Sequence, residues 1–94
     1  MAQKEKLGRH KINLSIWEGF LANLDRETRD VYSQAVRIFS EVNGFKSLEE
    51  AAAKGSEENF VNFVKALRDK GNPVNTIRLY SVAVRRFFES VKRP

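Results

Sequence analysis

The sequence of 94 residues contains no cysteine, one histidine, two prolines and no long apolar run. Without cysteine, neither a disulfide nor a thiolate metal site can form. No stretch approaches the roughly 20 apolar residues that span a bilayer, so no membrane partner is expected. The charged N-terminus also lacks the apolar centre of a signal peptide. These absences favour a cytoplasmic protein.

The patterns of catalytic sites are missing as well. The chain has no glycine-rich phosphate loop, no spacing typical of metal ligands and no serine or cysteine nucleophile beside a histidine. The single histidine, His10, falls in a polar stretch, and Tyr32 and Tyr80 fall on apolar helix faces. We expect a non-enzymatic protein that uses no metal, no other cofactor and no small-molecule substrate.

What the chain does contain is a series of helical patterns. No segment alternates with the period of two that marks a strand, and short loops separate segments with helical apolar spacing. Seven phenylalanines and one tryptophan supply the bulky core of a single small domain. The sequence therefore predicts an all-α fold, a compact bundle of four to five short helices.

The helix ends are predicted from capping residues. Ser15 with Glu18 opens the first helix, whose apolar face is Ile16, Trp17, Phe20, Leu21 and Leu24. Asp25 caps the second helix, which runs to about Asn43 and stops at Gly44. Its expected inner positions are Val31, Tyr32, Ala35, Ile38, Phe39 and Val42, bordered by Thr28 and Val36. Its expected outer positions are Arg26, Arg29, Ser33, Arg37 and Ser40.

Three more helices follow. Ser47 and Glu50 open the third, which ends at Gly55, and Ser56 caps the fourth, which ends at Gly71. Asn72 is expected to cap the fifth, with Pro73 as its first helical residue. The inner face of this last helix is predicted to hold Ile77, Tyr80, Val84, Phe87, Phe88 and Val91.

The outer face of the last helix is rich in arginine. Arg78, Arg85 and Arg86 lie there beside the apolar pair Leu79 and Val82. An i,i+4 ion pair is expected between Arg85 and Glu89. Asn75 and Thr76 occupy the first turn, where free N–H groups and the helix dipole favour a phosphate.

The net charge of +5 is unevenly distributed. Residues 1–14 carry +3, residues 15–71 carry −2 and residues 72–94 carry +4. We expect residues 1–13 to form a basic flexible arm and residues 14–94 to form the helical domain. A basic arm and a basic helix indicate nucleic acid as a partner.

Several residues together resemble a known family. They are Leu24, Thr28, Tyr32 and Phe39, followed by Phe63, Leu67, Gly71, Thr76, Ile77, Tyr80, Val84, Arg85, Phe87 and Phe88. Over about residues 14–92 the chain resembles the N-terminal core-binding (SAM-like) domain of tyrosine recombinases and phage integrases. That resemblance implies a module for DNA integration and recombination that clamps one side of double-stranded DNA and is associated with the nucleoid. The family's catalytic domain is missing, so this chain is not expected to cut DNA.

The resemblance also implies contact residues. It points to Arg26, Thr28 and Arg29 on one helix and to Asn75, Thr76 and Arg78 on another, and the exposed arginines Arg37, Arg85 and Arg86 extend these two faces. We expect the two helices to flank one DNA groove, with other recombinase subunits as further partners. Two alternatives stay open. One is a protein-interaction module that uses Leu79 and Val82 or the Trp17 helix. The other is a helix-turn-helix regulator with its turn at Gly71–Pro73.

Overall fold

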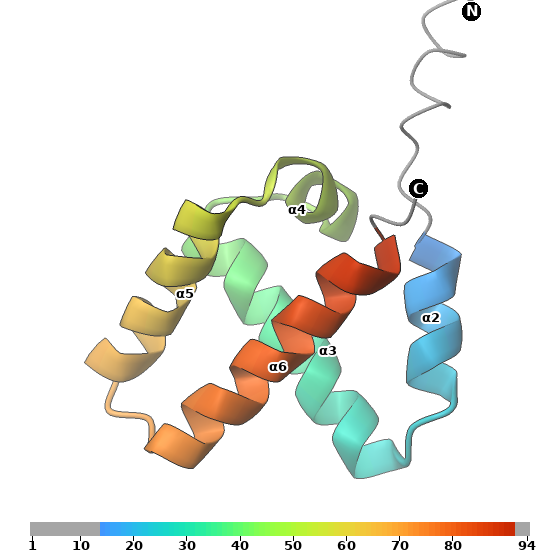
Figure 1. The fold of residues 1–94 in the computed structure, drawn as a ribbon, viewed down its shortest axis with the longest axis horizontal. Helices are drawn as coiled ribbons and strands as arrows, with labels where there is room; N and C mark the ends of the chain where they lie inside the picture. Colours follow the sequence, from blue (N-terminus) through green and yellow to red (C-terminus); the bar gives the residue numbers. More distant parts are fainter. Residues whose placement is uncertain (1–13, 92–94) are drawn as a thin grey trace, which may run out of the picture.

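The computed structural model describes residues 14–91, and these residues form five α-helices and no strand. The helices are α2 (Leu14–Ala22), α3 (Arg26–Val42), α4 (Leu48–Lys54), α5 (Glu57–Asp69) and α6 (Val74–Val91). Figure 1 shows α6 crossing in front of α3, with α2 and α5 on either side and α4 above them. The predicted all-α bundle is therefore confirmed. Among the described helices, none is long and apolar enough to cross a membrane.

An aromatic chain connects four of the five helices. Trp17 of α2 meets Phe87 edge-to-face at 5.2 Å between ring centroids, and Phe87 meets its neighbour Phe88 at 5.3 Å. Phe88 contacts Phe39 of α3 at 5.5 Å, and Phe39 contacts Phe63 of α5 at 5.7 Å. Such edge-to-face pairs each contribute about 0.5–1.5 kcal/mol beyond the burial of their area. The crossing of α3 and α6 is thus the centre of the core.

Most of the predicted helix ends are confirmed. The side chains of Asp25, Ser47 and Ser56 accept hydrogen bonds from the backbone three residues later, as N-caps do. Gly44 and Gly71 adopt φ values of 76° and 84° directly after the C-cap residues of α3 and α5. Only glycine enters this left-handed region without a steric penalty, which explains why both helices stop there.

Two predicted starts are wrong. α2 begins at Leu14, so Ser15 lies within its first turn rather than at its cap. At α6 the carbonyl of Pro73 accepts the first helical bond, from Ile77 N–H at 3.0 Å, so Pro73 and not Asn72 precedes the helix. The Asn72 side chain instead donates to the carbonyl of Leu67 at 2.9 Å. The last carbonyls of a helix need such donors, and Asn72 serves the end of α5.

Several burial predictions for α2 and α3 are also wrong. Ser40, predicted on the outer face, is 6% exposed, and its hydroxyl donates to the carbonyl of Val36 at 3.0 Å. Val36, predicted to border the inner face, belongs to the core at 1% exposed. The reason is that α4 and the loop before it pack beside this flank of α3. Conversely, Ile16 and Val42 were predicted to face inward and are exposed.

One asparagine joins the end of α3 to the start of α5. The Asn43 amide nitrogen donates to the carbonyls of Phe39 at 3.0 Å and Asn59 at 3.1 Å. Its oxygen accepts from the Asn59 amide at 2.9 Å. The Asn59 oxygen in turn accepts from the backbone N–H of Ser56, completing the capping box of α5. This network sets the position of α5 against α3.

Candidate nucleic-acid interface

The arginines in the middle of α6 turn to opposite sides of the helix. Arg85 lies over the ring of Phe60 in α5, 4.6 Å from the ring centroid. Arg86 approaches the ring of Phe20 in α2 at 5.9 Å and pairs with Glu89 at 3.7 Å. The predicted pair of Arg85 with Glu89 is therefore wrong, because the Arg85 guanidinium stacks on Phe60 instead. Both arginines are exposed, as predicted.

The first turn of α6 presents polar groups to solvent. Asn75 and Arg78 are exposed and Thr76 is half-buried. The backbone N–H groups before Ile77 have no carbonyl partner within the helix, because the first helical bond is the one from Ile77 to Pro73. Free N–H groups and the positive end of the helix dipole make this turn a favourable place for an anion.

The first turn of α3 is held by its cap. Asp25 Oδ1 accepts from the Thr28 backbone N–H at 2.9 Å. The hydrogen bond from the Thr28 side chain is the largest cause that lowers the pKa of the Asp25 carboxyl, followed by the bond from the Thr28 backbone. Thr28 is half-buried, and its hydrogen bonds to the Asp25 carboxyl hold the N-cap in place. Arg26 is exposed and Arg29 half-buried, so they are the cationic side chains of this turn.

The structure brings only part of the predicted site together. The first turns of α3 and α6 lie at the same edge of the molecule, the lower edge in Figure 1, on separate arms of the crossing. This edge carries Arg26, Thr28 and Arg29 from α3 and Asn75, Thr76 and Arg78 from α6. We call it the helix-start edge.

The other three arginines lie elsewhere. Arg37 is two residues before Phe39, and two residues of an α-helix turn by about 200°, so Arg37 points away from the core. It lines a shallow hollow with Asp30, Ser33 and Gln34 on the outer face of α3. Because α3 and α6 pack through their apolar faces, Arg37 and Arg85 point to opposite sides of the molecule. Arg37 therefore does not share a face with Arg85, and the shared DNA groove stays a prediction for the first turns of the two helices.

The folded body has no excess charge. Residues 14–91 contain eleven basic and eleven acidic side chains, so their net charge is zero. The whole excess of +5 belongs to residues 1–13 and 92–94. The predicted arm, His10, Lys92 and Arg93 all lie outside the described residues. Any electrostatic attraction of DNA by the body must come from the local arrangement of its arginines.

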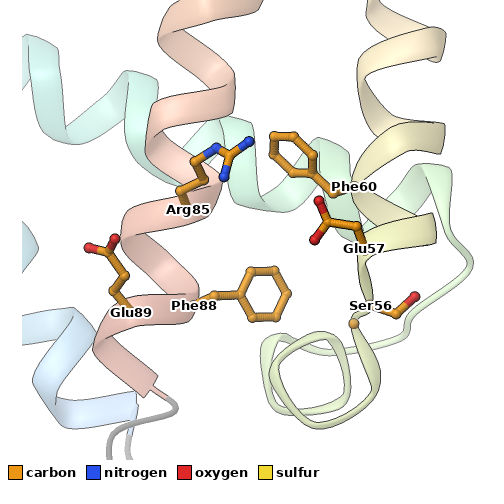
Figure 2. Close-up of a pocket in the computed structure, with 7 residues that line it drawn as sticks. Ser56, Glu57, Phe60, Arg85, Phe88 and Glu89 are labelled. Carbon is orange, nitrogen blue, oxygen red and sulfur yellow. The ribbon is translucent and has the colours of Figure 1, made fainter.

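A hollow between α5 and α6 was not predicted. It measures about 340 Å³ and is lined by Gly55, Ser56, Glu57, Phe60, Arg85, Phe88 and Glu89. Figure 2 shows Arg85 directed at Phe60 and the Phe88 ring directed toward the start of α5. A Cβ atom at Gly55 would overlap the Phe88 ring. No local pattern could have revealed this contact, since its two residues lie far apart in the sequence. Within residues 14–91, no group of three potential metal ligands is present.

Comparison with known proteins adds no identification. No protein-family model matches the chain, and no match is found among the curated proteins or the solved structures. The resemblance to core-binding domains therefore depends on the residues quoted for it.

Proposed function

We propose that the protein is a DNA-binding module that holds double-stranded DNA through its phosphates. It would act like the core-binding domain of a tyrosine recombinase or integrase, with the chemistry of recombination done by a separate catalytic domain. The observation that supports this best is the helix-start edge, where two helix N-termini and the cations Arg26, Arg29 and Arg78 lie at one side of the molecule.

The electrostatics of this edge favour phosphate. Within the described residues, Arg26 and Arg78 form no ion pair, and Arg29 acts on the Asp25 carboxylate only through its charge. Arginine binds phosphate through parallel N–H donors. The start of α6 adds backbone N–H groups, whereas the start of α3 is already capped by the Asp25 carboxylate. Residues 1–13 and 92–94 carry the net positive charge of the chain and would add contacts that do not depend on sequence.

Base reading would be limited to few residues. Asn75 and Arg78 are exposed at the start of α6 and have the side chains that pair with adenine and guanine edges in the major groove. Phosphate contacts would position the protein and these two residues would supply modest sequence preference.

The test is a salt titration with short duplex DNA and three variants. The logarithm of the affinity should fall linearly with the logarithm of the salt concentration. Arg78→Ala and Arg29→Ala should each weaken binding about tenfold at low salt and make the slope shallower by about 0.9. Lys54→Ala is the matched control, because Lys54 lies in α4 at the opposite edge and pairs with Glu50 at 3.5 Å. Absence of binding at low salt, or equal effects of all three variants, would contradict the proposal.

A protein-interaction module is the second candidate, favoured by the exposed apolar pair on α6. Leu79 and Val82 are 42% and 41% exposed and three residues apart, so they share one face. Chemical-shift mapping with duplex DNA separates the two functions. DNA bound as proposed should shift the amides around Arg29 and Arg78, whereas this alternative expects no DNA-dependent shifts there and a partner that shifts those around Leu79 and Val82.

A further inference from the structure

The hollow between α5 and α6 is faced by one carboxylate and one guanidinium that do not pair with each other. In Figure 2 the Glu57 carboxylate, from α5, and the Arg85 guanidinium, from α6, both point into the space between these helices. The Glu89 carboxylate is directed away from that space and pairs with Arg86 at 3.7 Å. Within residues 14–91, the side chains of Glu57 and Arg85 form no hydrogen bond and no ion pair. Both groups are therefore available to a ligand in the hollow.

Two aromatic rings give the hollow a planar apolar lining. Phe60 and Phe88 line it and are half-buried. The Arg85 guanidinium lies over the Phe60 ring, 4.6 Å from its centroid. A guanidinium in this position keeps its N–H donors in its own plane, so they can still donate to a ligand beside it. A flat aromatic ligand that stacks on Phe88 would thus meet donors from Arg85 and acceptors from Glu57.

The two charged groups specify the hydrogen-bonding pattern of such a ligand. A carboxylate accepts two parallel N–H bonds and a guanidinium donates two. Among the four DNA bases, guanine has an edge with two neighbouring donor groups, N1–H and the exocyclic N2 amine, and an adjoining edge with two acceptors, O6 and N7. Each of the other three bases has one donor group on its pairing edge. Guanine is also uncharged, which suits a hollow in which one positive and one negative group offset each other.

We infer that the α5–α6 hollow binds an unpaired guanine base, in a single strand or in a free nucleotide. Glu57 accepts from N1–H and the N2 amine, Arg85 donates to O6 and N7, and the base stacks on Phe88. The base must be unpaired, because pairing with cytosine occupies N1–H and the N2 amine. The site goes beyond the proposed binding of duplex phosphates and does not depend on it. Glu57 and Arg85 are exposed to competing water, so we expect a dissociation constant of about 1 mM.

Matched nucleotides test each edge of the base. Guanosine monophosphate, added to the full chain, should shift the amide resonances of residues 55–60 and 85–89. Inosine monophosphate differs only by lacking the N2 amine, and 7-deazaguanosine monophosphate differs only by lacking the N7 acceptor. Each should bind about tenfold more weakly, because one hydrogen bond to a charged group is lost. Since all three carry the same sugar and phosphate, contacts to those groups cancel in the comparison.

Two variants assign the edges to their residues. Glu57→Gln should bind guanosine monophosphate about tenfold more weakly and lose the preference over inosine monophosphate. Arg85→Lys should weaken binding similarly and lose the preference over the 7-deaza nucleotide, because an ammonium lacks the paired donors. The controls are Glu58→Gln and Arg68→Lys, whose exposed side chains lie on α5 without lining the hollow. Both should bind like the original chain, and circular dichroism should show equal helicity for all four variants.

A strand of thymidines with one guanine distinguishes the two sources of the base. Tighter binding of this strand than of guanosine monophosphate assigns the site to single-stranded nucleic acid, and equal binding assigns it to a free nucleotide. The annealed duplex should leave residues 55–60 unshifted, whereas the proposed function is tested by its effect around Arg29 and Arg78. Equal affinities for the guanosine and inosine nucleotides, a preference that persists in Glu57→Gln, or equal shifts of residues 55–60 by the duplex would overturn the inference.

Discussion

Gly55 is required by its close neighbours and not by its own backbone angles. Its φ of −62° is accessible to any residue, yet a Cβ atom there would lie within 2.9 Å of Phe88 Cε1 and 2.6 Å of the Ala51 carbonyl oxygen. We expect Gly55→Ala to lower the free energy of unfolding by about 1–3 kcal/mol through overpacking. Urea denaturation measures this change, and the penalty should shrink in a Phe88→Leu background.

Gly19 provides the opposite case for comparison. It lies inside α2, and a Cβ atom there would meet nothing within 4 Å. Gly19→Ala should therefore stabilise the protein by about 0.5–1 kcal/mol through the helix preference of alanine. Equal effects of the two glycine substitutions would show that the contact with Phe88 does not matter.

Asn43 is a second residue whose importance depends on a distant partner. Asn43→Ala removes the donors to Phe39 and Asn59 and leaves the Asn59 amide without its partner oxygen. We expect a loss of about 1–3 kcal/mol in the free energy of unfolding, because part-buried polar groups lose their hydrogen bonds. Asn62→Ala is the control, since Asn62 is exposed and reaches Asn43 only at 3.4 Å. Similar losses for both variants would argue against the network.

Gly55 and Asn43 show what the pattern of single residues in the sequence can predict. The sequence predicts helix ends at both positions, because glycine and asparagine are common there. It does not predict the Phe88 ring beside Gly55 or the amide of Asn59 beside Asn43. Those partners come from other helices, and local spacing carries no information about how helices pack.

At the scale of the helix, the starts of α3 and α4 are sensitive to pH. Hydrogen bonds from the Thr28 side chain and backbone lower the pKa of Asp25 from its usual 3.8, and the bond from the Lys46 backbone N–H is the largest cause that lowers the pKa of Glu50 from 4.5. A carboxyl whose pKa is lower in the folded state stabilises the fold above its unfolded pKa, and this stabilisation is lost as pH falls through the folded value.

Acid titration of stability tests these caps. The urea midpoint should fall as pH drops below about 4, the range of the unfolded carboxyl pKa values. An Asp25→Asn, Glu50→Gln variant should show a smaller decrease over the same range. Asp30→Asn is the control, because Asp30 lies on the outer face of α3 away from the cap. A pH dependence that does not change in the double variant would contradict this assignment.

Helix starts were predicted best where the cap is local. Asp25, Ser47 and Ser56 bond to the backbone three residues later, a spacing visible in the sequence. The start of α6 was misplaced by one residue because Asn72 bonds to the preceding helix instead. The inner faces of α3 and α6 were largely predicted by periodicity. Periodicity did not predict that these two faces pack against each other. That packing directs Arg37 and Arg85 to different sides of the molecule.

At the scale of the whole molecule, the body is neutral and the ends are basic. If the chain binds DNA as proposed, the N-terminal segment should supply much of the salt dependence. Replacing Lys4, Lys6, Arg9 and Lys11 by glutamine should make the slope of log affinity against log salt shallower by up to about 3–4, compared with about 0.9 for Arg78→Ala. Salt titrations of both variants check this difference. A slope equal to that of the original chain would show that residues 1–13 make no phosphate contacts.

The fold class was predictable from the whole sequence, and the site only in part. Helical periodicity without strand patterns leads directly to an all-α bundle. The helix-start edge collects six of the nine predicted residues, and the packing of α3 on α6 separates the other three. The α5–α6 hollow could not be predicted from the sequence, because only the packing of the helices brings together Gly55, Phe60 and Phe88, which come from three segments.

The contact between Trp17 and Phe87 also provides an optical signal. Trp17 is the only tryptophan in the chain, and it is 2% exposed between Phe20 and Phe87. Its fluorescence therefore reports the moment when the first described helix meets the last, the contact with the longest loop to close. In rapid-mixing experiments this emission would follow the closing of that loop, while circular dichroism follows the helices themselves. Coincident time courses would mean that the helices and the closed chain form together.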